Sequence, residues 1–150
     1  MAHATGMEYI NTKGLPHMSC AGCGNGIIVG AMARAFEELE LPRNKIVVIP
    51  GIGCSGTINR YINVNYLHST HGRAITYGTG IKATNPDLHV VAFVGDGDGA
   101  TIGGNHLIHA ARRNIGITVI LVNNYNYGMT GGQVSSATPH LAVTATTRGG

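Results

Sequence analysis

The stretch HVVAFVGDGDGATIGGNHLIHA, residues 89–110, carries the pattern from which the fold class can be inferred. Its first part, 89–94, is a largely apolar run, which is typical of a strand buried on both faces of a parallel sheet. A Gly-rich turn, GDGDGA at 95–100, follows this strand directly. From 102 to 114 the spacing of apolar residues predicts a helix. A strand, a tight turn and a helix in this order form the repeating unit of an α/β fold.

The same alternation continues on both sides of this stretch. The β-branched runs at 45–49 and 117–122 predict two further buried strands, and the apolar spacing at 25–39 and 74–83 predicts two further helices. We therefore expect an α/β fold in which helices sandwich a parallel sheet. Residues 1–18 and those beyond 128 carry no periodic pattern. Ligands bind at the carboxyl ends of such strands, so the loops that follow the strands should meet at one edge: 50–56, 95–100 and 123–132.

Length and composition exclude several classes of protein. The chain has 150 residues, which corresponds to one domain. Its 43% hydrophobic content and net charge of +3 exclude a disordered protein. Only 11% of residues are charged, against about 25% in an ordinary soluble domain. We therefore expect another subunit to cover part of the surface. The basic residues are scattered, so we expect no nucleic-acid binding. No apolar run reaches the ~18 residues of a membrane span, so we expect no membrane binding and a cytoplasmic location.

The Gly-rich turn fits several short motifs poorly. Residues 95–100 match the dinucleotide-binding fingerprint, but Asp96 and Asp98 would repel a pyrophosphate, and 123–124 is Asn-Asn where that fold needs an acidic residue. An EF-hand is excluded because Leu107 stands where the loop needs Glu. A P-loop is excluded because no Gly-Lys-Ser/Thr follows.

A divalent cation resolves the charge problem at this turn. Asp96 ends one predicted strand and Asn124 ends the next, 28 positions later, so one strand-helix-strand crossover brings their oxygens together. Mg²⁺ binds through one or two carboxylates and substrate phosphates. The predicted helix after the turn would direct its N–H groups at the same phosphates. The alternative is a Gly-rich turn in which the aspartates act only as caps.

The cysteines point to metal or redox chemistry. Cys20 and Cys23 have the Cys-x-x-Cys spacing, and Cys54 completes an odd count of three. Such a set in a reducing compartment favours metal or redox chemistry over disulfides. Buried free thiols, or a zinc site with a His ligand, remain alternatives.

The combined motifs resemble the β subunit of 2-oxoacid:ferredoxin oxidoreductases, a thiamine diphosphate-dependent family. The resemblance covers residues 15–140. The matching stretches are CAGCGNG (20–26), PGIGCSG (50–56), HGRA (71–74), GTGIKATNPDL (78–88), VGDGDGATIGGNHLIHAARRN (94–114) and NNYNYGMTGGQVSSATP (123–139).

The resemblance implies a thiamine diphosphate-binding fold of the diphosphate-binding type, and it implies three cofactors. Mg²⁺ would be held by the side chains of Asp96 and Asn124 and the main-chain carbonyl of Asn126. Thiamine diphosphate would be contacted by Ile52, Gly53, Cys54, Ser55, His71, Gly97 and Asp98. A [4Fe–4S] cluster would be held by Cys20, Cys23 and Cys54. A lone His such as His71 is more often a structural group, and the HGRA context is what favours the phosphate contact.

The implied reaction is the oxidative decarboxylation of a 2-oxoacid. Coenzyme A would take the acyl group, and electrons would pass through the cluster to ferredoxin. The implied partner is an α subunit, which would supply the group that activates the cofactor, so no catalytic acid or base is assigned in this chain. Relatives that act on pyruvate often carry Lys where this chain has Gly131, which favours 2-oxoglutarate or a branched-chain acid such as 2-oxoisovalerate.

One departure from the family keeps other hypotheses open. A [4Fe–4S] cluster has four ligands and this chain has three cysteines, so we expect residues 1–150 to be a thiamine diphosphate-binding domain that is incomplete at its C-terminus. The alternatives are a non-oxidative thiamine diphosphate-dependent decarboxylase or lyase, which would need no cysteines, and a non-catalytic fragment.

Overall fold

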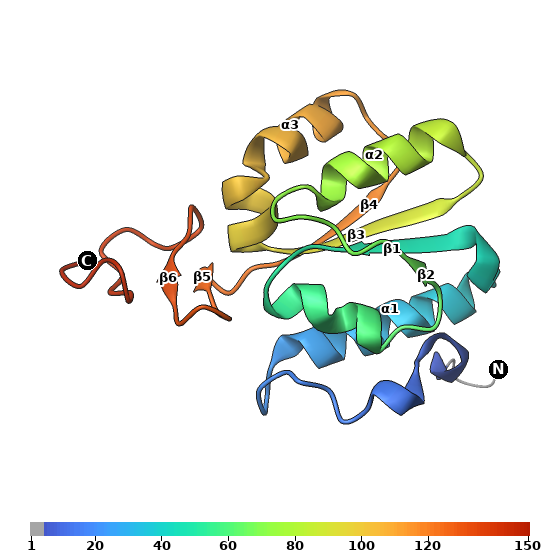
Figure 1. The fold of residues 1–150 in the computed structure, drawn as a ribbon, viewed down its shortest axis with the longest axis horizontal. Coiled ribbons are helices and arrows are strands. Elements are labelled where there is room, and N and C mark those ends of the chain that lie inside the picture. The colour runs from blue at the N-terminus through green and yellow to red at the C-terminus, as the bar shows by residue number, and fades with distance from the viewer. Residues whose placement is uncertain (1–4) are drawn as a thin grey trace.

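A parallel four-stranded sheet forms the centre of the molecule (Figure 1), in a computed structural model that describes residues 5–150. The strand order is β2-β1-β3-β4, and every pairing is parallel. The strands are β1 (Ile46–Pro50), β2 (Asn65–Tyr66), β3 (His89–Gly95) and β4 (Thr118–Val122). The fold class predicted from the sequence is thereby confirmed.

Three helices cover the two faces of the sheet. Helix α1 (Gly24–Glu38) lies on one face, and α2 (Ala74–Thr84) and α3 (Gly104–Arg112) lie on the other (Figure 1). These helices and the three longer strands begin and end close to the predicted positions, apart from α3, which is shorter than the predicted 102–114.

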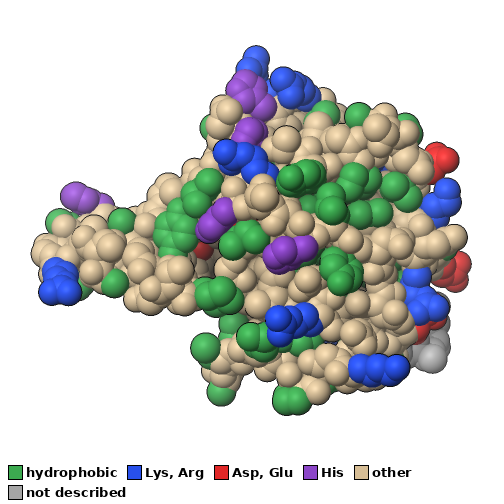
Figure 2. All heavy atoms as spheres, in the orientation of Figure 1, with side chains coloured by type: hydrophobic (Ala, Val, Ile, Leu, Met, Phe, Trp, Pro, Cys, Tyr) green, Lys and Arg blue, Asp and Glu red, His purple; other side chains and the backbone are tan. Residues whose placement is uncertain are grey.

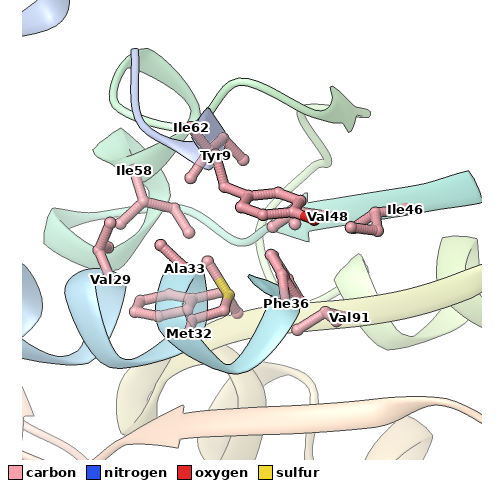
Figure 3. Close-up of a cluster of buried hydrophobic side chains, with 11 residues drawn as sticks. Tyr9, Val29, Met32, Ala33, Phe36, Ile46, Val48, Ile58, Ile62 and Val91 are labelled. Carbon is pink, nitrogen blue, oxygen red and sulfur yellow. The ribbon is translucent and has the colours of Figure 1, made fainter. Parts of the chain in front are cut away.

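The central strand β3 shows why the sheet needs helices on both sides. Val91 and Phe93 are buried in the cluster that β1 forms with α1 (Figure 3). Val90, Ala92 and Val94 are buried in a second cluster with residues of α2 and α3. Successive side chains of a strand point to opposite faces, so an uninterrupted apolar run needs cover on both.

The Gly-rich turn after β3 is helical rather than an open loop. Residues Asp96–Ile102 form a π-helical turn that leads into α3 at Gly104. The prediction of a free loop at 95–100 followed by a helix from 102 is therefore wrong about where the helical conformation begins. Such wide turns frequently occur at functional sites.

The remaining elements are short. Single 3₁₀ helices occur at Met7–Tyr9, Thr12–Gly14, Arg43–Lys45 and Cys54–Arg60. After β4, strands β5 (Asn126–Tyr127) and β6 (Gln133–Val134) pair antiparallel, and the chain beyond them extends away from the sheet (Figure 1). The expectation of no regular element beyond Gly128 is therefore wrong for β6.

Within residues 5–150, none of the helices combines the length and apolarity of a membrane span.

Candidate functional site

The loops after β1, β3 and β4 meet in one pocket, as the topology predicts. This pocket, which we call the strand-end pocket, is lined by all ten residues proposed for thiamine diphosphate and Mg²⁺: Ile52, Gly53, Cys54, Ser55, His71, Asp96, Gly97, Asp98, Asn124 and Asn126. Parallel strands end at the same edge of the sheet, so residues far apart in sequence converge there.

Three oxygen-bearing groups face one another in this pocket. Asp96 is only 1% exposed. One end of the Asn124 side-chain amide lies 2.8 Å from Asp96 Oδ1 and 2.8 Å from the main-chain carbonyl oxygen of Asn126. With nitrogen in that place, the amide donates to both oxygens. With oxygen there, three oxygens face one another, an arrangement that a cation between them would stabilise.

The spacing of these groups fits Mg²⁺. An octahedron whose metal–oxygen bonds are about 2.1 Å long has edges of about 3 Å. The two 2.8 Å separations are close to that edge length. The donors are a carboxylate, an amide and a carbonyl, which are the hard oxygen ligands that Mg²⁺ takes in proteins.

The second carboxylate of the turn has a different role. Asp98 is 2% exposed, and its Oδ1 accepts a hydrogen bond of 2.7 Å from the Gly72 main-chain N–H. His71 Nδ1 lies 2.5 Å from the same oxygen but is poorly aligned for an ordinary hydrogen bond. Asp98 therefore fixes the turn at 71–72 and lies against Nδ1 of the His71 ring, so Nε2 is the ring nitrogen that could bind a ligand.

The opposite oxygen of Asp98 is buried without a donor. Among residues 5–150 no group donates a hydrogen bond to Oδ2, and a Cβ added to Gly51 would collide with it. Only glycine at position 51 leaves room for this carboxylate.

The cysteines lie beside the strand-end pocket without forming a compact metal site. Cys23 N–H donates to the Cys20 carbonyl at 3.0 Å, so these two share one turn. Burial raises the pKa of the Cys54 thiol, and the Cys23 and Cys20 thiols raise it further. Cys54 also lines the pocket, which Cys20 and Cys23 do not.

No zinc-like site is preformed near these thiols. In the described part of the chain, 5–150, no three His, Cys, Asp or Glu side chains lie close enough to hold a single metal ion. All three cysteines are free thiols.

The structure adds residues that the sequence did not single out. Asn25 at the start of α1, together with Tyr127, Gly128 and Met129, also lines the strand-end pocket. All four lie inside the stretches that carry the family resemblance, which was the available signal. A fifth, Ser135, contacts Asp96 from outside the pocket.

Comparison with known proteins decides the family. The family model described as the C-terminal TPP-binding domain of thiamine pyrophosphate enzymes matches residues 51–149. This chain belongs to the thiamine pyrophosphate enzymes. The matched domain of this family contains the loop after β1, the π-helical turn and the loop after β4, so most of the strand-end pocket lies within it.

Relatives of this thiamine pyrophosphate enzyme chain include subunits of 2-oxoglutarate enzymes. It is 52% identical over 134 residues to the 2-oxoglutarate synthase subunit KorB of Methanocaldococcus jannaschii, covering 89% of this chain and 50% of that one. It is 46% identical to the 2-oxoglutarate oxidoreductase subunit KorB of Mycobacterium tuberculosis, covering 85% and 34%. The chain thus spans about half or less of the length of these curated relatives.

A solved structure has the same fold. The 2-oxoglutarate:ferredoxin oxidoreductase from Magnetococcus marinus, solved with 2-oxoglutarate, coenzyme A and succinyl-CoA bound, aligns with a TM-score of 0.92 and 37% sequence identity. The alignment covers 100% of this chain and 51% of that one.

Proposed function

We propose that this chain is part of the β subunit of a 2-oxoacid:ferredoxin oxidoreductase, with 2-oxoglutarate as the favoured substrate. The observation that carries the proposal is the strand-end pocket, in which the Asp96 carboxylate, the Asn124 amide and the Asn126 carbonyl converge beside Cys54. The relatives named as 2-oxoglutarate enzymes support the choice of substrate.

In this proposal Asp96, Asn124 and the Asn126 carbonyl hold Mg²⁺. The cation neutralises the charge of a diphosphate that would otherwise meet two carboxylates in one turn. Asp98 has different partners, since its Oδ1 accepts a hydrogen bond from the Gly72 N–H and lies against His71.

The residues around the cation hold thiamine diphosphate. The loop Ile52–Ser55 and Gly97 present main chain to the cofactor, and His71 binds a phosphate through Nε2. A Cβ on Gly97 would lie 2.6 Å from the Tyr127 ring, so glycine keeps this wall of the pocket compact. When bound, thiamine diphosphate supplies the electron sink for decarboxylation.

The thiols are proposed as ligands of a [4Fe–4S] cluster. Cys20, Cys23 and Cys54 supply three ligands and the fourth comes from outside this set, because the chain has three cysteines. Cys54 lines the strand-end pocket, and a Cβ on Gly128, in the loop after β4, would lie 3.8 Å from its Sγ. Electrons leaving the cofactor would thus have a short path to the cluster.

The proposed partners are an α subunit, ferredoxin and coenzyme A, in a cytoplasmic complex. Several large apolar side chains are exposed, among them Ile27 on α1 and Met129, which lines the strand-end pocket. Acidic side chains are sparse on the face shown in Figure 2. Such a surface fits coverage by another subunit. The free thiols fit a reducing compartment.

A non-oxidative thiamine diphosphate lyase is the second candidate. It would use the same Mg²⁺ site, but it would need no thiols. The position of Cys54 in the lining of the pocket favours the oxidative enzyme.

The deciding experiment is an anaerobic viologen-reduction assay on the chain co-produced with its α subunit. We expect reduction that requires both 2-oxoglutarate and coenzyme A, together with iron–sulfur absorbance. Decarboxylation without viologen reduction or iron–sulfur absorbance would indicate the lyase. Absence of activity with any 2-oxoacid would overturn the proposal.

A further inference from the structure

Ser135 supports the carboxylate of Asp96 from the side opposite Asn124. Its hydroxyl donates to Asp96 Oδ2, because a carboxylate can only accept. Asp96 Oδ1 faces the Asn124 amide and accepts from the Asn124 main-chain N–H at 3.3 Å. The two oxygens of Asp96 are thus divided between the proposed metal and Ser135, which is itself only 6% exposed.

The Ser135 hydroxyl is held in place by its own turn. The Ala137 N–H donates to Ser135 Oγ at 3.2 Å, and the Ser135 N–H donates to Thr138 Oγ1 at 2.9 Å. Thr138 in turn donates to the Tyr125 carbonyl at 2.5 Å. The hydroxyl proton of Ser135 is therefore left for Asp96, and the turn is attached to the loop that carries Asn124 and Asn126.

A second connection joins the same turn to the π-helical turn of Asp96. The Ser136 N–H donates to Thr101 Oγ1 at 3.0 Å, and the Thr101 hydroxyl donates to the Asp96 carbonyl at 3.2 Å. Residues 135–138 therefore link both loops that carry the proposed metal ligands.

We propose that Ser135 is a positioning residue for the metal site, fixing Asp96 so that Oδ1 faces the cation. The inference rests on the proposed function, since it needs Asp96 as a ligand. Partners that orient a metal ligand from behind typically change metal affinity about 10- to 100-fold when removed. Ser135 touches neither cation nor diphosphate in this role, so it acts through Asp96.

The test measures Mn²⁺ binding by electron paramagnetic resonance, with thiamine diphosphate present, in the assembled complex. We expect Ser135→Ala to weaken Mn²⁺ binding about 10- to 100-fold. Ser135→Thr, which keeps the hydroxyl, should restore most of the affinity. Ser69→Ala is the matched control: it removes another buried serine hydroxyl, which donates to the Pro50 carbonyl rather than to Asp96, and should leave the affinity unchanged.

Thermal unfolding of each variant separates positioning from a purely structural role. A Ser135→Ala variant that is less stable but binds Mn²⁺ like the unmodified protein, while Asp96→Ala loses binding, would overturn this inference and leave the proposed metal site standing. Unchanged Mn²⁺ affinity in Asp96→Ala would overturn the metal site itself and the inference with it. If Ser135→Ala does not fold, Ser135→Cys tests the same point, because its S–H is a weaker donor in nearly the same space.

Discussion

Replacing Gly51 by Ala tests how tightly the second carboxylate is held. A Cβ at this position would lie 1.9 Å from Asp98 Oδ2 and 3.2 Å from Val94 Cγ1. Asp98 cannot turn away without losing its 2.7 Å hydrogen bond from the Gly72 N–H. Overpacking in a buried site costs about 1–3 kcal/mol, and losing a hydrogen bond to a charged group costs about 1.5–3 kcal/mol. We therefore expect Gly51→Ala to lower the free energy of unfolding by about 2.5–6 kcal/mol.

The assay is urea unfolding followed by circular dichroism, with Gly80→Ala as the control. Gly80 lies inside α2, and a Cβ there meets no atom within 4 Å. Alanine at this position should raise the free energy of unfolding by up to about 1 kcal/mol, through helix propensity. A Gly51→Ala variant within about 1 kcal/mol of the unmodified protein, well below the expected overpacking and hydrogen-bond losses, would refute the reasoning about Asp98.

Three further predictions follow from the same structure. Tyr9→Phe removes the 2.8 Å hydrogen bond from the Tyr9 hydroxyl to the Leu41 carbonyl and should lower the free energy of unfolding by about 1 kcal/mol in a urea titration at pH 7. Burial raises the pKa of the Tyr9 hydroxyl, and the nearby Glu8 and Glu37 raise it further. The stability that the protonated hydroxyl contributes is therefore fully present below pH ~10 and is lost as pH rises through the pKa of Tyr9 in the folded protein. This loss of stability at high pH should be missing in Tyr9→Phe. His71→Ala should weaken thiamine diphosphate binding at least about tenfold in a calorimetric titration, by loss of a charge-assisted hydrogen bond, and should leave the circular dichroism spectrum unchanged. Removing divalent cations with a chelator should abolish thiamine diphosphate binding in the same titration, and added Mg²⁺ should restore it.

The sequence predicted the elements that depend on long apolar patterns. The strands β1, β3 and β4 are runs of apolar residues, and both faces of each run need cover. Their positions in the sequence and their parallel direction therefore follow from the pattern alone. The loops after these strands lie close together because the carboxyl ends of parallel strands are all at the same edge of the sheet.

Side-chain direction could not be predicted in the same way. Asp96 and Asp98 stand two positions apart in a Gly-rich turn that reads as a loop, and only the π-helical geometry turns one toward Asn124 and the other toward Gly72. Ser135 gave no signal, because serine is common in polar turns and its partner lies 39 positions away. The two-residue strands are too short to carry a period.

The central claim is that the strand-end pocket binds thiamine diphosphate through a cation held by Asp96. Isothermal titration calorimetry of thiamine diphosphate into the purified complex, with and without Mg²⁺, tests it most directly when the unmodified protein is compared with Asp96→Ala. We expect thiamine diphosphate to bind the unmodified protein only when Mg²⁺ is present, and not to bind Asp96→Ala. Binding of equal strength without Mg²⁺, or in Asp96→Ala, would contradict it.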